Sequence, residues 1–146
     1  MVFNSIEQFE EYVMKKCKNA VTNTQKEVRE DVRNLAQNFY DDYYPPIMYE
    51  RTEQLTSNKF IQMSPVNLFG KICEADVHLE PNSLSYDTGK KPSGEQVVSA
   101  AVSGGHGATG LKVVYGGGAK LWEKDILQSK ANKDLVQQLR AQGIPM

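Results

Sequence analysis

Residues 44–57 read Tyr-Pro-Pro-Ile-Met-Tyr-Glu-Arg-Thr-Glu-Gln-Leu-Thr-Ser, and this stretch separates two parts of the chain that differ in character. The consecutive prolines Pro45 and Pro46 end any helix that reaches them, because proline lacks a backbone N–H and restricts the residue before it to extended geometry. Residues 1–43 are predicted to form a helical arm. Residues 44–146 are predicted to form a sheet-containing body with glycine-rich loops, and the length suits a single domain.

The N-terminal arm carries apolar side chains at steps of three or four residues, with Asn4 or Ser5 as the N-cap. The stripe consists of Ile6, Phe9, Val13, Cys17, Ala20, Thr24, Val28, Val32, Leu35 and Phe39. Its mean step of about 3.67 residues is closer to the period of a straight helix than to that of a left-handed coiled coil. The pattern fits one helix from about Ser5 to Asp42, or two helices broken at the polar, β-branched run Val21–Thr24.

An unbroken helix has a consequence for quaternary structure. It would span roughly 55 Å at 1.5 Å per residue, whereas a domain of 146 residues has a diameter of somewhat under about 40 Å. The apolar stripe would then extend beyond its own domain and need a second surface, most simply a neighbouring subunit. The sequence therefore predicts an assembly.

Two strands are expected after the prolines, over residues 59–63 and 71–79. Residues 67–70 between them are expected to form the turn of an antiparallel hairpin. Alternation along the second strand gives one cleaner core face, and its members are Cys73, Ala75, Val77 and Leu79.

The remaining elements complete an α+β fold. A short helix opened by Ser93, a strand within residues 112–115 and a last helix capped by Asn132 and ended by Gly143 are expected. The predicted architecture is a long N-terminal helix packed on a small, mostly antiparallel sheet, with a short C-terminal helix.

The bulk composition argues against several functional classes. The 17 basic and 18 acidic residues give a net charge of -1, without the basic footprint of a dedicated nucleic-acid binder. Cys17 and Cys73 belong to no ligand-spaced pair, as expected for a reduced cytosolic protein. We expect neither a secretory signal nor a membrane span, because acidic residues interrupt the N-terminal apolar positions.

No motif with a defined chemistry is present. The glycine-rich residues 104–110 lack the Lys-Ser or Lys-Thr of a P-loop and the strand–helix context of a dinucleotide site. The two histidines, His78 and His106, have no partners at the spacing of a zinc motif. A nucleophile pair such as Cys73 with His106 stays an open alternative that no sequence feature supports. We therefore expect no enzyme activity, no cofactor and no metal.

The aromatic residues near the end of the arm suggest contacts instead. Tyrosines suit partly wet interfaces, although they can also cap the end of a core. The candidate contacts with a subunit or partner are Phe9, Val13, Tyr40, Tyr43, Tyr44, Tyr49 and Arg51.

Tyr49, Arg51, Thr52, Leu55 and Ser57 follow the helical arm and its prolines. This order resembles a family of structural proteins of tailed bacteriophages, the neck or tail-completion proteins, also described as head–tail joining or minor tail components. In that family a helix and a proline lead into a segment with Thr, Leu and Ser and then into a strand. The glycine-rich region with its His-Gly pair, the late aromatic residue and the terminal helix are also similar.

The resemblance implies a ring of like subunits, six by analogy with the family, at the neck or tail end of the virion. The implied partners are the chain itself and the neighbouring tail-tube and head-completion proteins, with DNA passing non-specifically and no membrane. The implied location is the virion, and the host cytoplasm before assembly. The alternative function is a small cytosolic adaptor that binds a protein partner through its amphipathic helix.

Overall fold

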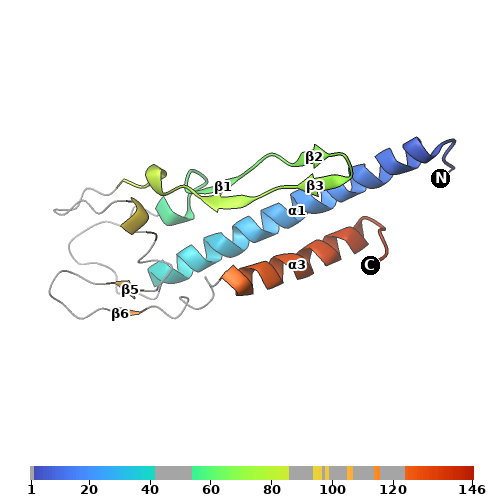
Figure 1. Cartoon of the computed structure of the whole chain (residues 1–146). Helices are drawn as coiled ribbons and strands as arrows, with labels where there is room; N and C mark the ends of the chain where they lie inside the picture. The colour runs from blue at the N-terminus through green and yellow to red at the C-terminus, as the bar shows by residue number, and fades with distance from the viewer. Residues whose placement is uncertain are drawn as a thin grey trace.

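A long helix, α1 (Ile6–Asp41), lies between a β-hairpin on one side and the C-terminal helix α3 (Lys124–Ala141) on the other (Figure 1). The computed structural model describes residues 2–41, 54–85, 94–96, 98, 105–106, 114–115 and 124–146. The N-terminal end of α1 extends past both neighbouring elements (Figure 1). The predicted α+β architecture is confirmed.

Helix α1 is continuous, so the alternative of two helices broken at Val21–Thr24 is wrong. The hydroxyls in this run bond back to the helix itself: Thr22 Oγ1 donates to Lys18 O and Thr24 Oγ1 to Ala20 O, each at 2.8 Å. Threonine side chains that make such bonds are accommodated inside a helix. At the start, Ser5 Oγ accepts the backbone N–H of Gln8 at 3.2 Å, as an N-cap does.

The hairpin consists of two antiparallel ladders. Strand β1 (Ile61–Met63) pairs with β4 (Val77–Leu79), and β2 (Asn67–Phe69) pairs with β3 (Ile72–Glu74). Between the ladders residues 64–66 lie opposite residues 75–76, which leaves one extra residue on the first side, as in a β-bulge.

The expectation that residues 67–70 form the turn is wrong, because residues 67–69 are strand and the chain reverses at Gly70 and Lys71. Gly70 has φ +57°, which favours glycine and places the reversal there. The expected core face is confirmed: its members are half-buried, whereas the alternating residues are exposed, among them Ile72, Glu74, Asp76 and His78.

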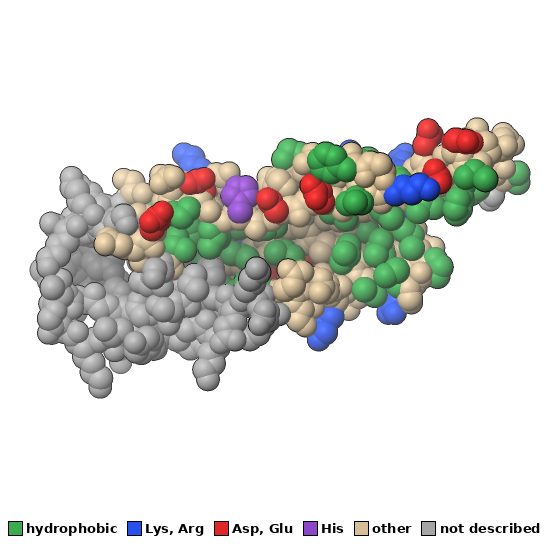
Figure 2. Space-filling model, viewed as in Figure 1, with side chains coloured by type: hydrophobic (Ala, Val, Ile, Leu, Met, Phe, Trp, Pro, Cys, Tyr) green, Lys and Arg blue, Asp and Glu red, His purple; other side chains and the backbone are tan. Residues whose placement is uncertain are grey.

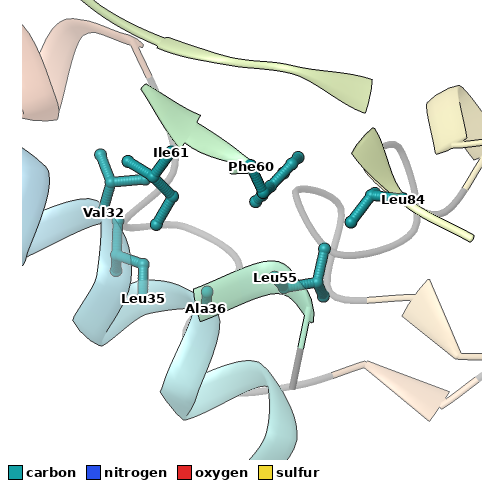
Figure 3. Close-up of a cluster of buried hydrophobic side chains, with 7 residues drawn as sticks. All are labelled: Val32, Leu35, Ala36, Leu55, Phe60, Ile61 and Leu84. Atoms are coloured by element: carbon teal, nitrogen blue, oxygen red, sulfur yellow. The ribbon is translucent and has the colours of Figure 1, made fainter. Parts of the chain in front are cut away.

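The core lies under the base of the hairpin, beside the second half of α1 (Figure 3). Its buried side chains come from α1, from the short helix η1 (Gln54–Thr56), from the start of β1 and the residue before it, and from the residue after η2 (Pro81–Ser83). They are Val32, Leu35, Ala36, Leu55, Phe60, Ile61 and Leu84.

Helix α3 begins at Lys124, so the expectation that Asn132 caps it is wrong. Asn132 lies in mid-helix, where its side chain accepts a hydrogen bond from Gln128 one turn earlier, at 3.2 Å. The predicted end is confirmed. Gly143 has φ +83°, and the N–H groups of Gly143 and Ile144 close a Schellman motif onto Arg140 O and Leu139 O.

Helix α3 runs antiparallel to α1, and polar side chains bond between the two helices. Gln138 Nε2 donates to Glu27 Oε1 at 2.7 Å, and Lys130 Nζ donates to Asp31 Oδ2 at 2.6 Å. The hydrogen bond raises the pKa of Lys130. The glycine-rich part contributes a two-residue ladder between β5 (Gly105–His106) and β6 (Val114–Tyr115). Strand β6 lies within the expected residues 112–115, whereas β5 lies where a loop and no strand was expected.

Candidate functional site

The most distinctive surface is the free N-terminal end of α1, because α1 is twice as long as the helix beside it. Helix α1 has 36 residues and α3 has 18, which corresponds to about 54 Å and about 27 Å. The Schellman turn after Ala141 ends α3, so among the described residues no helix lies beside the N-terminal turns of α1 on that side.

Helical geometry gives the direction in which the side chains of the free end point. Eighteen residues make about five turns of an α-helix, so residues 18 apart point in the same direction. Phe9 stands 18 residues before Glu27, and Val13 stands 18 before Asp31, and both Glu27 and Asp31 bond to α3. Phe9 and Val13 therefore lie on the α3-facing side of α1, beyond the point where α3 ends.

The apolar side chains of this end form what we call the helix-tip patch: Ile6, Phe9 and Tyr12. Their exposed fractions are 74%, 50% and 36%. The ring of Phe3 packs on both aromatic residues, with centroid separations of 5.2 Å in each case. Lys16 Nζ lies 5.5 Å from the centroid of the Tyr12 ring, which places one cation at the edge of the patch.

A second exposed apolar group lies on the hairpin, and we call it the hairpin-tip patch: Leu68, Phe69 and Ile72. Their exposed fractions are 46%, 59% and 63%. Phe69 and Ile72 are directly paired across the two strands, so their side chains share one face. Figure 2 shows hydrophobic side chains gathered over this end of the molecule, with charged side chains among them.

A shallow groove of about 300 Å³ separates the hairpin from the first turns of α1. Lys71 Nζ bridges it to Glu10 Oε1 at 2.7 Å, and this hydrogen bond raises the pKa of Lys71. The groove is lined by Glu7, Glu10, Glu11, Met14, Leu68, Gly70 and Lys71. Its lining combines acidic and apolar side chains with the one ammonium group of Lys71.

The segment that carries the phage resemblance is structural where the model describes it. Leu55 is 1% exposed and forms part of the core. Ser57 Oγ donates to Gln54 O at 2.7 Å and accepts the N–H of Phe60 at 3.3 Å. Gln54 in turn bonds twice to the backbone of Ser85, at 2.6 and 2.7 Å. These residues hold η1 against the start of the hairpin and the chain that leaves it.

The titratable side chains do not converge on a reactive centre within the part of the chain described. His78 Nδ1 lies 3.0 Å from Asp76 Oδ1 on the exposed face of the hairpin, and this contact is the main cause that lowers the pKa of Asp76. Burial raises the pKa of the Cys73 thiol, and Cys17 nearby adds to this rise. Among the described residues no group of three potential metal ligands occurs, and no helix has the length and apolar character for a membrane crossing.

The predicted contact residues divide into three sets. Phe9 and Val13 lie together at the free end of α1, exposed and half-buried respectively. Tyr40 belongs to the last turn of α1, with no description of its side chain. Tyr43, Tyr44, Tyr49 and Arg51 lie outside the described residues.

Sequence reasoning missed the hairpin-tip patch. Its members were assigned to a turn or left off the core face of the strand. The sequence feature that could have revealed the patch is Ile72. It alternates with the core-facing residues as Glu74 and Asp76 do, so its side chain has to point outward with theirs. An apolar residue in an outward-facing position is a reason to look for a contact.

A family model, YomN, matches residues 5–142, so the chain belongs to the YomN family. This family is phage-derived, with a name from an SPβ-like prophage. No curated protein and no solved structure matches the chain.

Proposed function

We propose that this member of the phage-derived YomN family is a structural protein of a phage or phage-tail-like particle, which forms a ring of like subunits at the neck or tail end and joins or completes the tail. One observation carries this proposal: α1 is continuous over 36 residues, and the buried hydrophobic cluster of the described chain lies beside its second half, while Ile6 and Phe9 at its start are exposed. The first turns of the helix present apolar side chains that a neighbour can cover.

The surface composition supports a role in contacts rather than in chemistry. Large apolar residues occupy exposed positions on both the helix and the hairpin at the same end of the molecule. Contiguous exposed apolar surface of this kind marks protein–protein interaction sites. The described polar groups serve the fold: Arg33, for example, donates to Thr56 O at 3.0 Å and to Asn58 Oδ1 at 2.5 Å.

The near-neutral charge agrees with a ring through which DNA passes without being held. The chain carries 17 basic and 18 acidic residues. A tight phosphate binder would concentrate lysine and arginine, and its affinity would oppose passage. On this proposal the neighbours of the ring are tail-tube and head-completion proteins.

The test is the composition and symmetry of the particle itself. Mass spectrometry of purified particles is expected to detect the chain, and cryo-electron microscopy is expected to place it as a symmetric ring at the head–tail junction or the tail end. Deletion of its gene is expected to leave heads and tails unjoined or tails incomplete. Absence from the particle, or presence without ring symmetry, would contradict the proposal.

The exposed helix-tip patch also suits a second candidate, an adaptor that binds another protein through α1. An adaptor would be missing from purified particles and would instead copurify with one partner from infected cells. The same particle preparation therefore separates the two functions.

A further inference from the structure

Two unlike apolar patches occupy the same end of the molecule but lie on opposite sides of α1. The hairpin contacts one side, where Gln25 Nε2 donates to Ser64 O and Asp76 O at 2.7 and 2.6 Å. Phe9 points to the other side, in the direction of the α3 contacts. The hairpin and α3 stand on opposite sides of the helix along its length (Figure 1).

The helix-tip patch continues an interface that already exists within the chain. Along residues 23–31 the same side of α1 is covered by α3, through bonds such as Asn23 Nδ2 to Gln138 Oε1 at 3.3 Å. Beyond the end of α3 the stripe goes on with Val13, Phe9 and Ile6, which become progressively more exposed. Within the part of the chain that the structure describes, no element covers Phe9 and Ile6.

The two faces carry charges of opposite sign, while Lys71 beside Ile72 is already paired with Glu10. The outward face of the hairpin carries the exposed carboxylates of Glu74 and Asp76, next to the Phe69–Ile72 pair. The helix-tip patch has the ammonium group of Lys16 at its edge. On the same side of α1, the exposed charged residues of α3 from residue 127 onward are all basic: Lys130, Lys133 and Arg140.

We propose that these two patches bind one another between copies: the outward hairpin face of one copy, through Phe69 and Ile72, packs on Ile6 and Phe9 of the next. This inference deepens the proposed ring and rests on that function, because it names the surfaces through which the subunits meet. The occupant of each patch is therefore a second copy of this chain.

The unlike nature of the patches determines the kind of assembly. A twofold dimer uses one surface against itself, whereas a contact between two different surfaces leaves a free patch at each end of the pair. Such a head-to-tail contact repeats until the rotation closes the ring. Closure of the ring also covers the exposed ends of strands β2 and β3. Exposed strands of this kind can otherwise pair non-specifically with other chains.

Disulfide trapping between two single-cysteine variants tests this contact, even if it is weak in solution. The background is Cys17→Ala with Cys73→Ala, and the variants add Phe9→Cys or Ile72→Cys at exposed positions. Each is checked for folding by circular dichroism and for its melting temperature. The two variants are then oxidised separately and as an equal mixture, at the same total concentration.

A head-to-tail contact is expected to produce a covalent dimer in the mixture, with at least fivefold more product than either variant forms alone. The matched control replaces Ile72→Cys by Ser129→Cys, an exposed position on α3, and is expected to give only the background level. No dimer in the mixture would overturn the proposal. Equal dimer from Phe9→Cys alone would overturn it in favour of a twofold contact.

If the cysteine-free background fails to fold, a photo-crosslinking residue at position 9 of the otherwise native chain serves instead. The variant is mixed with isotope-labelled native chain, and the crosslinked peptides are mapped by mass spectrometry. Crosslinks to residues 67–74 of the labelled copy are expected, and crosslinks confined to other segments would contradict the contact.

The outcomes separate this inference from the function on which it rests. A ring seen in the particle without the Phe9–Ile72 crosslink would retain the structural role and reject these surfaces. The crosslink in a chain that is absent from the particle would retain the contact between copies and reject the proposed function.

Discussion

Gln25 shows at the scale of one residue how the hairpin is attached to α1. Its side chain is 7% exposed, and its Nε2 donates to the carbonyl oxygens of Ser64 and Asp76 at 2.7 and 2.6 Å. The N–H of Ser64 also bonds to Asp76 O, at 3.1 Å. The amide thus satisfies backbone groups where the regular ladder is interrupted.

Replacement of Gln25→Ala is expected to lower the free energy of unfolding by about 1–3 kcal/mol, because the half-buried Ser64 O loses the amide that donates to it. The matched control is Gln137→Ala on the exposed face of α3, where the effect is expected to stay within about 0.5 kcal/mol. Urea denaturation followed by circular dichroism measures both. Equal effects would show that the amide contributes no more than an exposed glutamine.

The Asp76 carboxylate gives a prediction for pH. The hydrogen bond with His78 is the main cause that holds the pKa of Asp76 below its ordinary value of 3.8, and the bond with Ser64 adds to it. A lowered pKa in the folded state stabilises the fold above the unfolded pKa of about 3.9, and this contribution is lost as pH falls through the folded pKa. The affected window therefore lies just below about pH 4.

His78→Ala is expected to move the pKa of Asp76 back toward its ordinary value, since the larger cause is then removed. A carboxyl-carbon NMR titration of both proteins from neutral to acid pH measures the change. An unchanged midpoint would mean that the Ser64 contact alone sets the pKa.

At the scale of elements, the second half of α1 owes its stability to the side chains that enter the core. Leu35 is 6% exposed, whereas its neighbour Asn34 is exposed. Leu35→Ala is expected to cost about 2–5 kcal/mol of unfolding free energy, as other buried leucines do. Asn34→Ala is expected to be neutral or slightly stabilising, because alanine has the higher helix propensity. Chemical denaturation of the pair checks the register of the helix.

The end of α3 depends on one backbone conformation. Gly143 has φ +83°, which side chains other than glycine rarely adopt. Gly143→Ala is expected to cost about 1–2 kcal/mol, because a Cβ is strained in the left-handed region. Gly143→Asn is expected to cost less, since asparagine tolerates this conformation at helix ends. Melting temperatures that fail to rank glycine above asparagine above alanine would contradict the Schellman assignment.

At the scale of the whole molecule, the stability of α1 is expected to vary along its length. The buried α1 residues of the core cluster, Val32, Leu35 and Ala36, lie in its second half, while Ile6 and Phe9 are exposed in the first. Helical hydrogen bonds without packed side chains open more readily. Hydrogen–deuterium exchange is expected to be faster over residues 8–14 than over residues 28–36. Equal protection of the two segments in a monomeric sample would be inconsistent with this gradient.

Local sequence patterns were enough to predict several elements of the fold. Apolar spacing predicted α1, strand alternation predicted the half-buried face that includes Cys73 and Val77, and a glycine after an amphipathic run predicted the end of α3. The resemblance also led correctly to a phage-derived family. These features are encoded by neighbouring residues, so they can be recognised without knowledge of the rest of the fold.

Contacts between side chains that are far apart in the sequence became visible in the three-dimensional structure alone. Arg33 has the sequence position of an exposed helix residue that should tolerate alanine, yet it bonds to Thr56 O and Asn58 Oδ1 and also pairs with Glu30. Phe9 is exposed because α3 ends before it reaches the first turns of α1. This result depends on how two segments far apart in the sequence are aligned along each other. Such contacts depend on the three-dimensional path of the backbone. A local pattern of residue types carries no information about that path.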